Sequence, residues 1–309
     1  MKRVRLPMQG LILLLALLLS ACQPANTHPS PGPGLKVLAV ETFLADMAQN
    51  VAGDRVKVET LMPAGLDPHA FEPTPQDIAK ISSSQVLIQN GHGLEDWLAK
   101  ILENAGGQRL VIQASEGLAS RSPQPGEIAG NDSQDQQGDP HFWLDPLSAI
   151  KYAENIRDGL SQADPEGKDI YAKNAEAYIA RLKELDGWVQ GEVGQIPPAQ
   201  RQLVTNHESF GYYADRYGFH IVGAIIASVS SSASPSARQM AALIDTIRQT
   251  GAPAIFLETG ANPQLANQIT RGRRIRPLTR RSVAPATRAS QGPLVDAPAR
   301  REVLPAPRP

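Results

Sequence analysis

The stretch PEGKDIYAKNAEAYIARLKELDGWVQGEV, residues 165–193, decides the fold. Its apolar residues recur every three or four positions, which is the period of one helix face. This apolar stripe consists of Tyr171, Ala175, Tyr178, Leu182, Leu185 and Val189. A helix of this length would measure about 42 Å, and Pro197 and Pro198 end it. Such a helix can run the length of a molecule with two lobes.

Strands and helices are expected to alternate on both sides of this helix. Before it, short apolar runs predict strands at 35–40, 56–61, 86–89 and 109–113. Between and after them, helical periods occur at 41–51, 76–82, 94–104 and 145–160. After it, strands are expected at 202–205, 220–226 and 254–257, with helices at 210–217, 236–250 and from 263. This alternation favours mainly parallel sheets covered by helices. The predicted fold class is α/β, with lobes over 35–160 and 197–270 joined by a linking helix over 161–196.

The first 34 residues are typical of an exported lipoprotein. A basic start (Lys2, Arg3, Arg5) precedes a short apolar run over 11–19, which is the pattern of a secretory signal and too short to span a membrane comfortably. The following Leu-Ser-Ala-Cys resembles the bacterial lipobox, which implies a signal over 1–21 and lipidation of Cys22. An ordinary signal followed by a chance cysteine is the alternative. Residues 22–34, rich in Pro, Gly, Ser and Asn, predict a flexible tether.

The composition changes abruptly at Arg271. Residues 271–309 hold ten arginines and only two acidic residues, Asp296 and Glu302, a net charge of +8. Because the segment lacks a helical or strand period, we expect no core element from it and a C-terminal lobe that is incomplete. Our interpretation is that the original C-terminus has been replaced, for example by a frameshift. A disordered tail, or a basic arm for anionic partners, is the alternative, although nucleic acid is an improbable partner outside the cell.

Three histidines occupy unusual sequence contexts. His69 and His141 each follow Asp-Pro, and His207 lies in Thr-Asn-His-Glu-Ser. Each is expected in a loop after a strand or before a helix, and such loops meet at the carboxyl ends of parallel strands. Three neutral imidazoles suit Zn²⁺ and leave one position open. We therefore predict a metal site of His69, His141 and His207, and treat His28, His92 and His220 as structural.

Acidic residues beside these histidines are candidates for orienting the imidazoles. A carboxylate that accepts the second ring N–H of a histidine fixes its tautomer. The candidates are Asp67, Asp139, Asp145 and Glu208. The single cysteine excludes a disulfide framework and any Cys-x-x-Cys metal site. The loop over 120–138 lacks large apolar residues and histidine, so we expect a solvated, mobile surface loop in which Glu127, Asp132 and Asp135 attract cations only weakly.

Five stretches resemble the zinc- and manganese-specific solute-binding lipoproteins of bacterial ABC transporters. They are PAGLDPHAFEPTPQD (63–77), NGHGLEDW (90–97), DPHFWLDP (139–146), TNHESFGYYADRYG (205–218) and IFLETGANP (255–263). The resemblance covers about 35–270 and implies two α/β lobes, one long rigid helix and a metal ion between the lobes. By the family pattern His69 and His141 are ligands from the N-terminal lobe. His207 matches a ligand that is histidine in zinc-type members and typically glutamate in manganese-type members.

The resemblance also defines what this chain lacks. The fourth family ligand is usually acidic and follows the last strand of the C-terminal lobe, where this chain has its arginine-rich segment, so no fourth ligand is assigned. Zinc-type members often carry a histidine-rich loop where 120–138 lies, and this loop contains none. A water ligand, or reduced affinity, is the expected consequence.

The predicted function is capture of a metal ion, Zn²⁺ in the first place and Mn²⁺ in the second, and its delivery to an ABC permease. The protein is expected to be an extracytoplasmic monomer, anchored to membrane lipid through Cys22, that binds no nucleic acid and is not an enzyme. Metal binding should weaken at low pH because the imidazoles must be neutral. A metal-dependent hydrolase with Glu208 as base is a rival, but the chain has no His-Glu-x-x-His, Gly-x-Ser-x-Gly or phosphate-loop motif. A surface adhesin and a C-terminally defective binding protein are the remaining alternatives.

Overall fold

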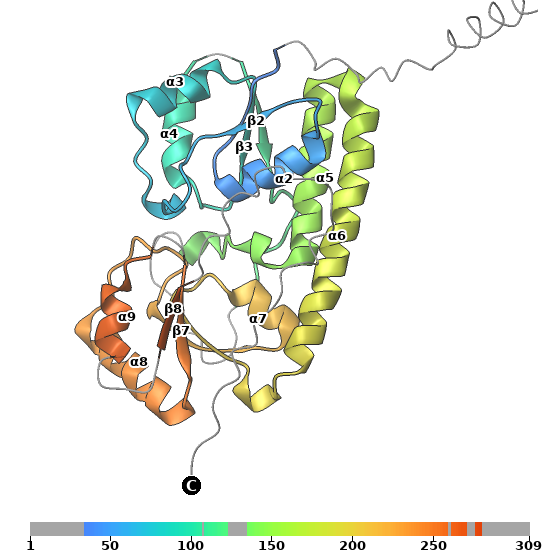
Figure 1. The fold of residues 1–309 in the computed structure, drawn as a ribbon. Coiled ribbons are helices and arrows are strands. Elements are labelled where there is room, and N and C mark those ends of the chain that lie inside the picture. The colour runs from blue at the N-terminus through green and yellow to red at the C-terminus, as the bar shows by residue number, and fades with distance from the viewer. Residues whose placement is uncertain (1–33, 107, 123–134, 259–260, 271–275, 280–309) are drawn as a thin grey trace, which may run out of the picture.

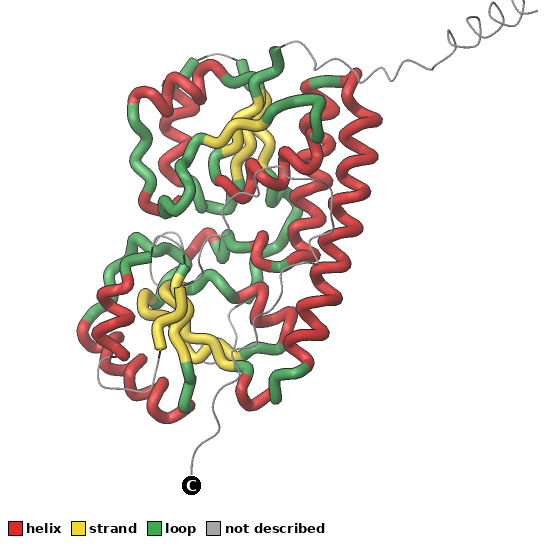
Figure 2. The backbone as a smooth tube through the Cα atoms, in the orientation of Figure 1, coloured by secondary structure: helices red, strands yellow, loops and turns green. Residues whose placement is uncertain are grey.

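The computed structural model describes residues 34–106, 108–122, 135–258, 261–270 and 276–279. Figure 1 shows two lobes, one above the other, with α6 running beside both of them. Each lobe has strands at its centre and helices around them (Figure 2). The predicted signal, Cys22, His28 and most of the tether lie outside the described residues, as do Glu127 and Asp132. Within the described ranges no helix is long and apolar enough to cross a membrane.

The N-terminal lobe is a four-stranded parallel sheet in the order β2-β1-β3-β4. Its strands are β1 (Val37–Ala39), β2 (Val58–Thr60), β3 (Val86–Gln89) and β4 (Leu110–Gln113). Helices α2 (Thr42–Ala52) and α5 (Pro146–Ala163) cover one face, and α3 (Pro75–Ser83) and α4 (Asp96–Asn104) cover the other. Because both faces are covered, the central strands are continuously apolar rather than alternating, as the fully buried Val37, Leu38 and Ala39 show.

The C-terminal lobe repeats this plan with the order β6-β5-β7-β8, again all parallel. Its strands are β5 (Gln202–His207), β6 (His220–Ile226), β7 (Ala254–Leu257) and β8 (Arg276–Thr279). Helices α8 (Ala237–Thr250) and α9 (Pro263–Thr270) pack on one face, and α7 (Gly211–Tyr217) packs on the other. Short 3₁₀ turns complete the described elements, at Pro68–Ala70, Asp135–Gln137, Phe142–Leu144, Pro165–Gly167 and Pro198–Gln200.

Helix α6 (Lys168–Gly194) has 27 residues and spans about 40 Å. Its buried side chains Tyr171, Ala175 and Leu182 join the core of the N-terminal lobe. Further along, Asp186 accepts hydrogen bonds from Arg216 and Tyr217 of α7. The predicted apolar stripe is only partly buried, because Leu185 is 44% exposed, and its neighbour Trp188 is 62% exposed. The sequence period identifies the helix correctly, but beyond Leu182 the buried face passes through Asp186 and Val193, which leaves Leu185 of the predicted stripe exposed.

A strand follows α9, which corrects the prediction that no core element comes after residue 270. Strand β8 pairs with β7 in parallel, with Ala254 opposite Arg276 and Leu257 opposite Thr279. Pro277 lacks an N–H, and prolines within sheets are largely confined to edge strands such as this one. A four-residue edge strand depends on main-chain pairing and on the preceding helix, so it has no apolar period that a sequence pattern could reveal. Whether residues 280–309 are a replaced C-terminus stays a prediction, because they lie outside the described part.

Candidate metal centre

The two Asp-Pro-His segments share one local hydrogen bond, from the histidine N–H to the aspartate two residues before it. In the 3₁₀ turn at Pro68–Ala70, Asp67 Oδ1 accepts a hydrogen bond from the His69 backbone N–H at 3.1 Å. Asp139 Oδ1 likewise accepts from the His141 backbone N–H at 2.9 Å. An aspartate that binds the backbone two residues ahead makes a compact turn, and proline between the two stiffens it. Both aspartates therefore fix the backbone that presents a histidine.

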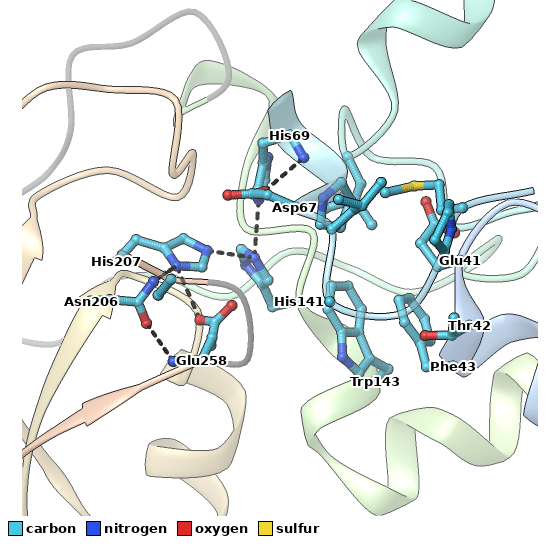
Figure 3. Close-up of a pocket in the computed structure, with 17 residues that line it drawn as sticks. Glu41, Thr42, Phe43, Asp67, His69, His141, Trp143, Asn206, His207 and Glu258 are labelled. Atoms are coloured by element: carbon cyan, nitrogen blue, oxygen red, sulfur yellow. Dashed lines mark hydrogen bonds and ion pairs between the residues drawn. The ribbon is translucent and has the colours of Figure 1, made fainter. Parts of the chain in front are cut away.

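The three predicted histidines converge between the lobes (Figure 3). His141 Nε2 lies 3.3 Å from His69 Nε2 and 3.1 Å from His207 Nε2. One nitrogen from each imidazole lies within 4.8 Å of the other two. With Zn–N bonds of 2.0–2.1 Å in a tetrahedral site, neighbouring ligand nitrogens are about 3.3–3.4 Å apart. The spacing of the imidazoles therefore fits one small cation bound by all three, and His141 and His207 are 2% exposed.

Carboxylates behind two of the rings determine which nitrogen faces the centre. Asp139 Oδ1 lies 2.8 Å from His141 Nδ1, and Glu258 Oε1 lies 3.0 Å from His207 Nδ1. The Asn206 amide also contacts His207 Nδ1, at 3.1 Å, but the charge-assisted bond to the carboxylate is the stronger one. Each Nδ1 therefore carries the proton, and each Nε2 offers a lone pair. Two lone pairs 3.1 Å apart repel unless a proton or a metal cation lies between them.

The electrostatic surroundings favour positive charge in the centre. Burial lowers the pKa of His207, but Glu258 and then Asp67 and Asp139 outweigh it, so the pKa is raised overall. Burial raises the pKa of Glu258, but the positive charges of His207 and His141 and a hydrogen bond from Ser209 hold it at about 2. Glu258 is thus ionised under all ordinary conditions. The same negative charge that stabilises a protonated His207 attracts a metal cation.

The remaining predicted site residues have other surroundings. Asp145 caps α5, where its carboxylate accepts from the Leu147 N–H and the Ser148 hydroxyl, and it pairs with Arg216 at 3.1 Å. Asp145 therefore caps a helix and does not orient an imidazole. The Glu208 backbone N–H donates to Ser228 O, and the role predicted for its side chain stays a prediction. His92 packs edge-on against Phe142, and His220 is exposed.

Glu258 is the functional residue that the sequence analysis missed. It follows β7 directly, at the carboxyl end of a parallel strand, where ligands gather in α/β sheets. That position, within the quoted IFLETGANP stretch, is the signal that could have identified it. Its carboxylate is 37% exposed and faces the pocket that the three histidines line (Figure 3).

Known proteins share both the sequence and the fold of this chain. Residues 37–292 match the family described as zinc-uptake complex component A, periplasmic, so the match extends into the arginine-rich segment. The manganese-binding lipoprotein MntA of Halalkalibacterium halodurans is 34% identical over 270 residues, 84% of this chain and 83% of that protein.

Two solved structures are also similar. The periplasmic zinc-binding protein TroA of Treponema pallidum has a TM-score of 0.70 at 26% identity, over 79% of this chain and 86% of that one. The laminin-binding protein Lmb of Streptococcus agalactiae, described as having adhesin and metal-transporting activity, has a TM-score of 0.69 at 27% identity, over 80% and 88%. The chain therefore belongs to the zinc-uptake complex component A family and is a metal-binding substrate-binding protein of an ABC transporter.

Proposed function

We propose that the protein captures Zn²⁺ through His69, His141 and His207 and delivers it to a permease in the cytoplasmic membrane. The third imidazole, His207, carries the proposal. Manganese prefers hard oxygen ligands, whereas imidazole suits zinc, and the distances from His141 Nε2 to the Nε2 atoms of His69 and His207 are close to those between nitrogens bound to one Zn²⁺. Glu258 supports the same reading, because it orients His207 by accepting from its Nδ1–H.

Manganese is the second candidate cargo. Several relatives are named as manganese proteins, including MntA of Halalkalibacterium halodurans and PsaA of Streptococcus pneumoniae. The relatives' names also describe lipoproteins, which supports anchoring through Cys22 and a location outside the cytoplasm. No separate catalytic step is needed for this function, since binding, docking and release are enough to deliver a cation.

Calorimetric titration of residues 23–309, the chain without its predicted signal and lipidated Cys22, with Zn²⁺ and with Mn²⁺ tests the proposal. We expect tight one-to-one binding of Zn²⁺ that is abolished by His207→Ala. Because divalent affinities rise from Mn²⁺ to Zn²⁺ at almost any nitrogen and oxygen site, the ratio alone does not identify the cargo. His207→Glu is therefore the matched variant: it should weaken Zn²⁺ binding and leave Mn²⁺ binding unchanged or stronger. Equal loss of both metals in His207→Glu, or no Zn²⁺ binding by the folded chain, would contradict the assignment.

A further inference from the structure

Two buried carboxyl groups lie behind the metal centre, and the function proposed above does not use them. Glu41 follows β1 and is 3% exposed, and Glu95 precedes α4 and is 6% exposed. Glu41 occupies the N-cap position of α2, but its side chain makes no capping hydrogen bond there. Both of its carboxylate oxygens are buried and accept no hydrogen bond from an N–H or O–H of the described residues, while Glu95 acts on it as the adjacent carboxyl group. Figure 3 places Glu41 beside Thr42 and Phe43 on the pocket wall, away from Glu258.

Glu95 holds a turn that the backbone would not adopt readily. Its Oε1 accepts from the Asn90 N–H at 2.5 Å, and its Oε2 accepts from the Gly91 N–H at 3.0 Å. In this turn, residues 90–93, Gly91, His92 and Gly93 all have positive φ, at 86°, 52° and 79°. A histidine with positive φ is uncommon, and such conformations persist only where the surroundings enforce them. Both oxygens of Glu95 supply that enforcement.

The 90–93 turn contacts the residues on both sides of His141, the backbone of Pro140 and the ring of Phe142. The fully buried Asn90 donates from Nδ2 to Pro140 O at 3.1 Å, and the His92 ring packs on Phe142 with centroids 4.9 Å apart. Asn90 cannot rotate away, because its Oδ1 accepts from the Tyr152 hydroxyl at 2.5 Å. Movement of the turn would therefore move His141.

We propose that Glu41 and Glu95 form one carboxylic acid–carboxylate pair that holds the 90–93 turn, and that this turn positions His141 in the metal centre. Two negative charges in contact inside a protein are strongly unfavourable, so the pair shares one proton. The geometry assigns that proton to Glu41, since both oxygens of Glu95 accept backbone N–H groups and stabilise its charge. The pKa directions agree: burial and then Glu95 raise the pKa of Glu41 well above its usual value, while the N–H groups of Asn90 and Gly91 oppose the rise for Glu95. The metal-binding part of this inference rests on the zinc function proposed above.

Two isosteric variants of the mature chain test the pair. In Glu41→Gln a carboxamide N–H stands where the proposal puts the acid proton, so it can still donate to Glu95. We expect Zn²⁺ affinity within about twofold of the wild type. In Glu95→Gln only one oxygen remains for two N–H groups, so we expect affinity to fall about tenfold, as for other groups that support metal ligands. The visible spectrum of bound Co²⁺ should change in Glu95→Gln and not in Glu41→Gln, because it reports ligand geometry.

A control separates positioning from general loss of stability. Ile81→Val removes one methylene from the fully buried Ile81 in the same lobe. It should lower Tm by destabilising the lobe, without changing Zn²⁺ affinity or the Co²⁺ spectrum. Equal affinity loss in Glu41→Gln and Glu95→Gln would refute the assigned proton. An unchanged affinity and spectrum in Glu95→Gln would refute the positioning role.

A metal-free measurement distinguishes failure of this inference from failure of the zinc function. In NMR spectra of the apo chain, the Asn90 and Gly91 amide protons should be strongly protected from exchange in the wild type and in Glu41→Gln, and exposed in Glu95→Gln. If the wild type binds no Zn²⁺, the proposed function fails, and these amides still decide whether the carboxyl pair holds the turn. Exchange that is equally slow in all three proteins would overturn the pair.

Discussion

His141 Nε2 and His207 Nε2 lie 3.1 Å apart although one residue belongs to each lobe. A cation bound by both imidazoles would therefore hold the lobes together directly. The groups behind each ring should then affect both the strength of metal binding and the contact between the lobes.

Removing the charge behind His207 should weaken metal binding. Glu258→Gln eliminates the carboxylate that accepts from His207 Nδ1, so the ring loses its fixed orientation and part of its basicity. We expect Zn²⁺ affinity to fall about 10- to 100-fold, measured by competition with a chelating dye. Glu192→Gln, an exposed change on α6, is the control and should have no effect. Equal affinities for the two variants would show that Glu258 does not orient the ligand.

A hydrogen bond between the lobes should slow metal release. The Ser231 hydroxyl, in the loop after β6, donates to Asp67 Oδ2, and the Ser232 hydroxyl donates to His69 O at 3.3 Å. Ser231→Ala removes a bond worth about 0.5–1.5 kcal/mol, so stopped-flow chelation should show release about two- to tenfold faster. Ser234→Ala, in the same loop and exposed, should release at the wild-type rate. A Ser231→Ala rate within error of the control would exclude this contact as a barrier to opening.

Two glycines should respond in opposite ways to alanine. A Cβ at Gly191 in α6 would meet no atom within 4 Å, and alanine is favoured over glycine inside a helix by about 1 kcal/mol. Gly218 ends α7 with φ of 69°, a conformation that alanine adopts only with strain. We therefore expect Gly191→Ala to raise Tm by a few degrees, about 2–4 °C, and Gly218→Ala to lower it. Calorimetry of the apo chain measures both, and a fall in Tm for Gly191→Ala would contradict the open environment.

Acid should destabilise the metal-free protein through two aspartates, Asp164 just before α6 and Asp186 within it. Arg55 lowers the pKa of Asp164, and Arg216 lowers that of Asp186. Because the folded pKa lies below the unfolded value of about 3.9, each group stabilises the fold fully above that value. The stabilisation is lost as the pH falls through the folded pKa.

Urea unfolding of apo protein between pH 7 and pH 3 measures this dependence. The free energy of unfolding should fall below about pH 4 in the wild type. Asp186→Asn should be less stable at pH 7 and should lose less stability on acidification. Parallel curves for wild type and Asp186→Asn would show that the contact with Arg216 contributes nothing to folding.

Long or repeated sequence patterns predicted the structure well, and features without such a pattern were missed. The apolar period over 165–193 predicts α6 within a few residues at each end, and the repeated Asp-Pro-His identifies two of the three converging imidazoles. Asp139 Oδ1 lies 2.8 Å from His141 Nδ1, the contact that an orienting carboxylate would make. Asp145 does not follow this pattern, since a carboxylate before proline also caps a helix and neighbouring residues in sequence do not reveal which. Glu258 and β8 depend on strand pairing in the C-terminal lobe, and that pairing leaves little local pattern.

The three glycines of α6 affect where this helix can bend. Gly187, Gly191 and Gly194 lie in its C-terminal part, and a Cβ at any of them would meet nothing within 4 Å, so close packing does not require them. Glycine is less favourable than alanine in a helix interior, so we expect this stretch to deform more easily than the stretch with Tyr171, Ala175 and Leu182, which packs in the N-terminal core. Elastic bending should therefore concentrate near one end of the rod. A small bend there would produce a larger displacement at the distant pocket. It would separate His207 from His141 without breaking the core of either lobe.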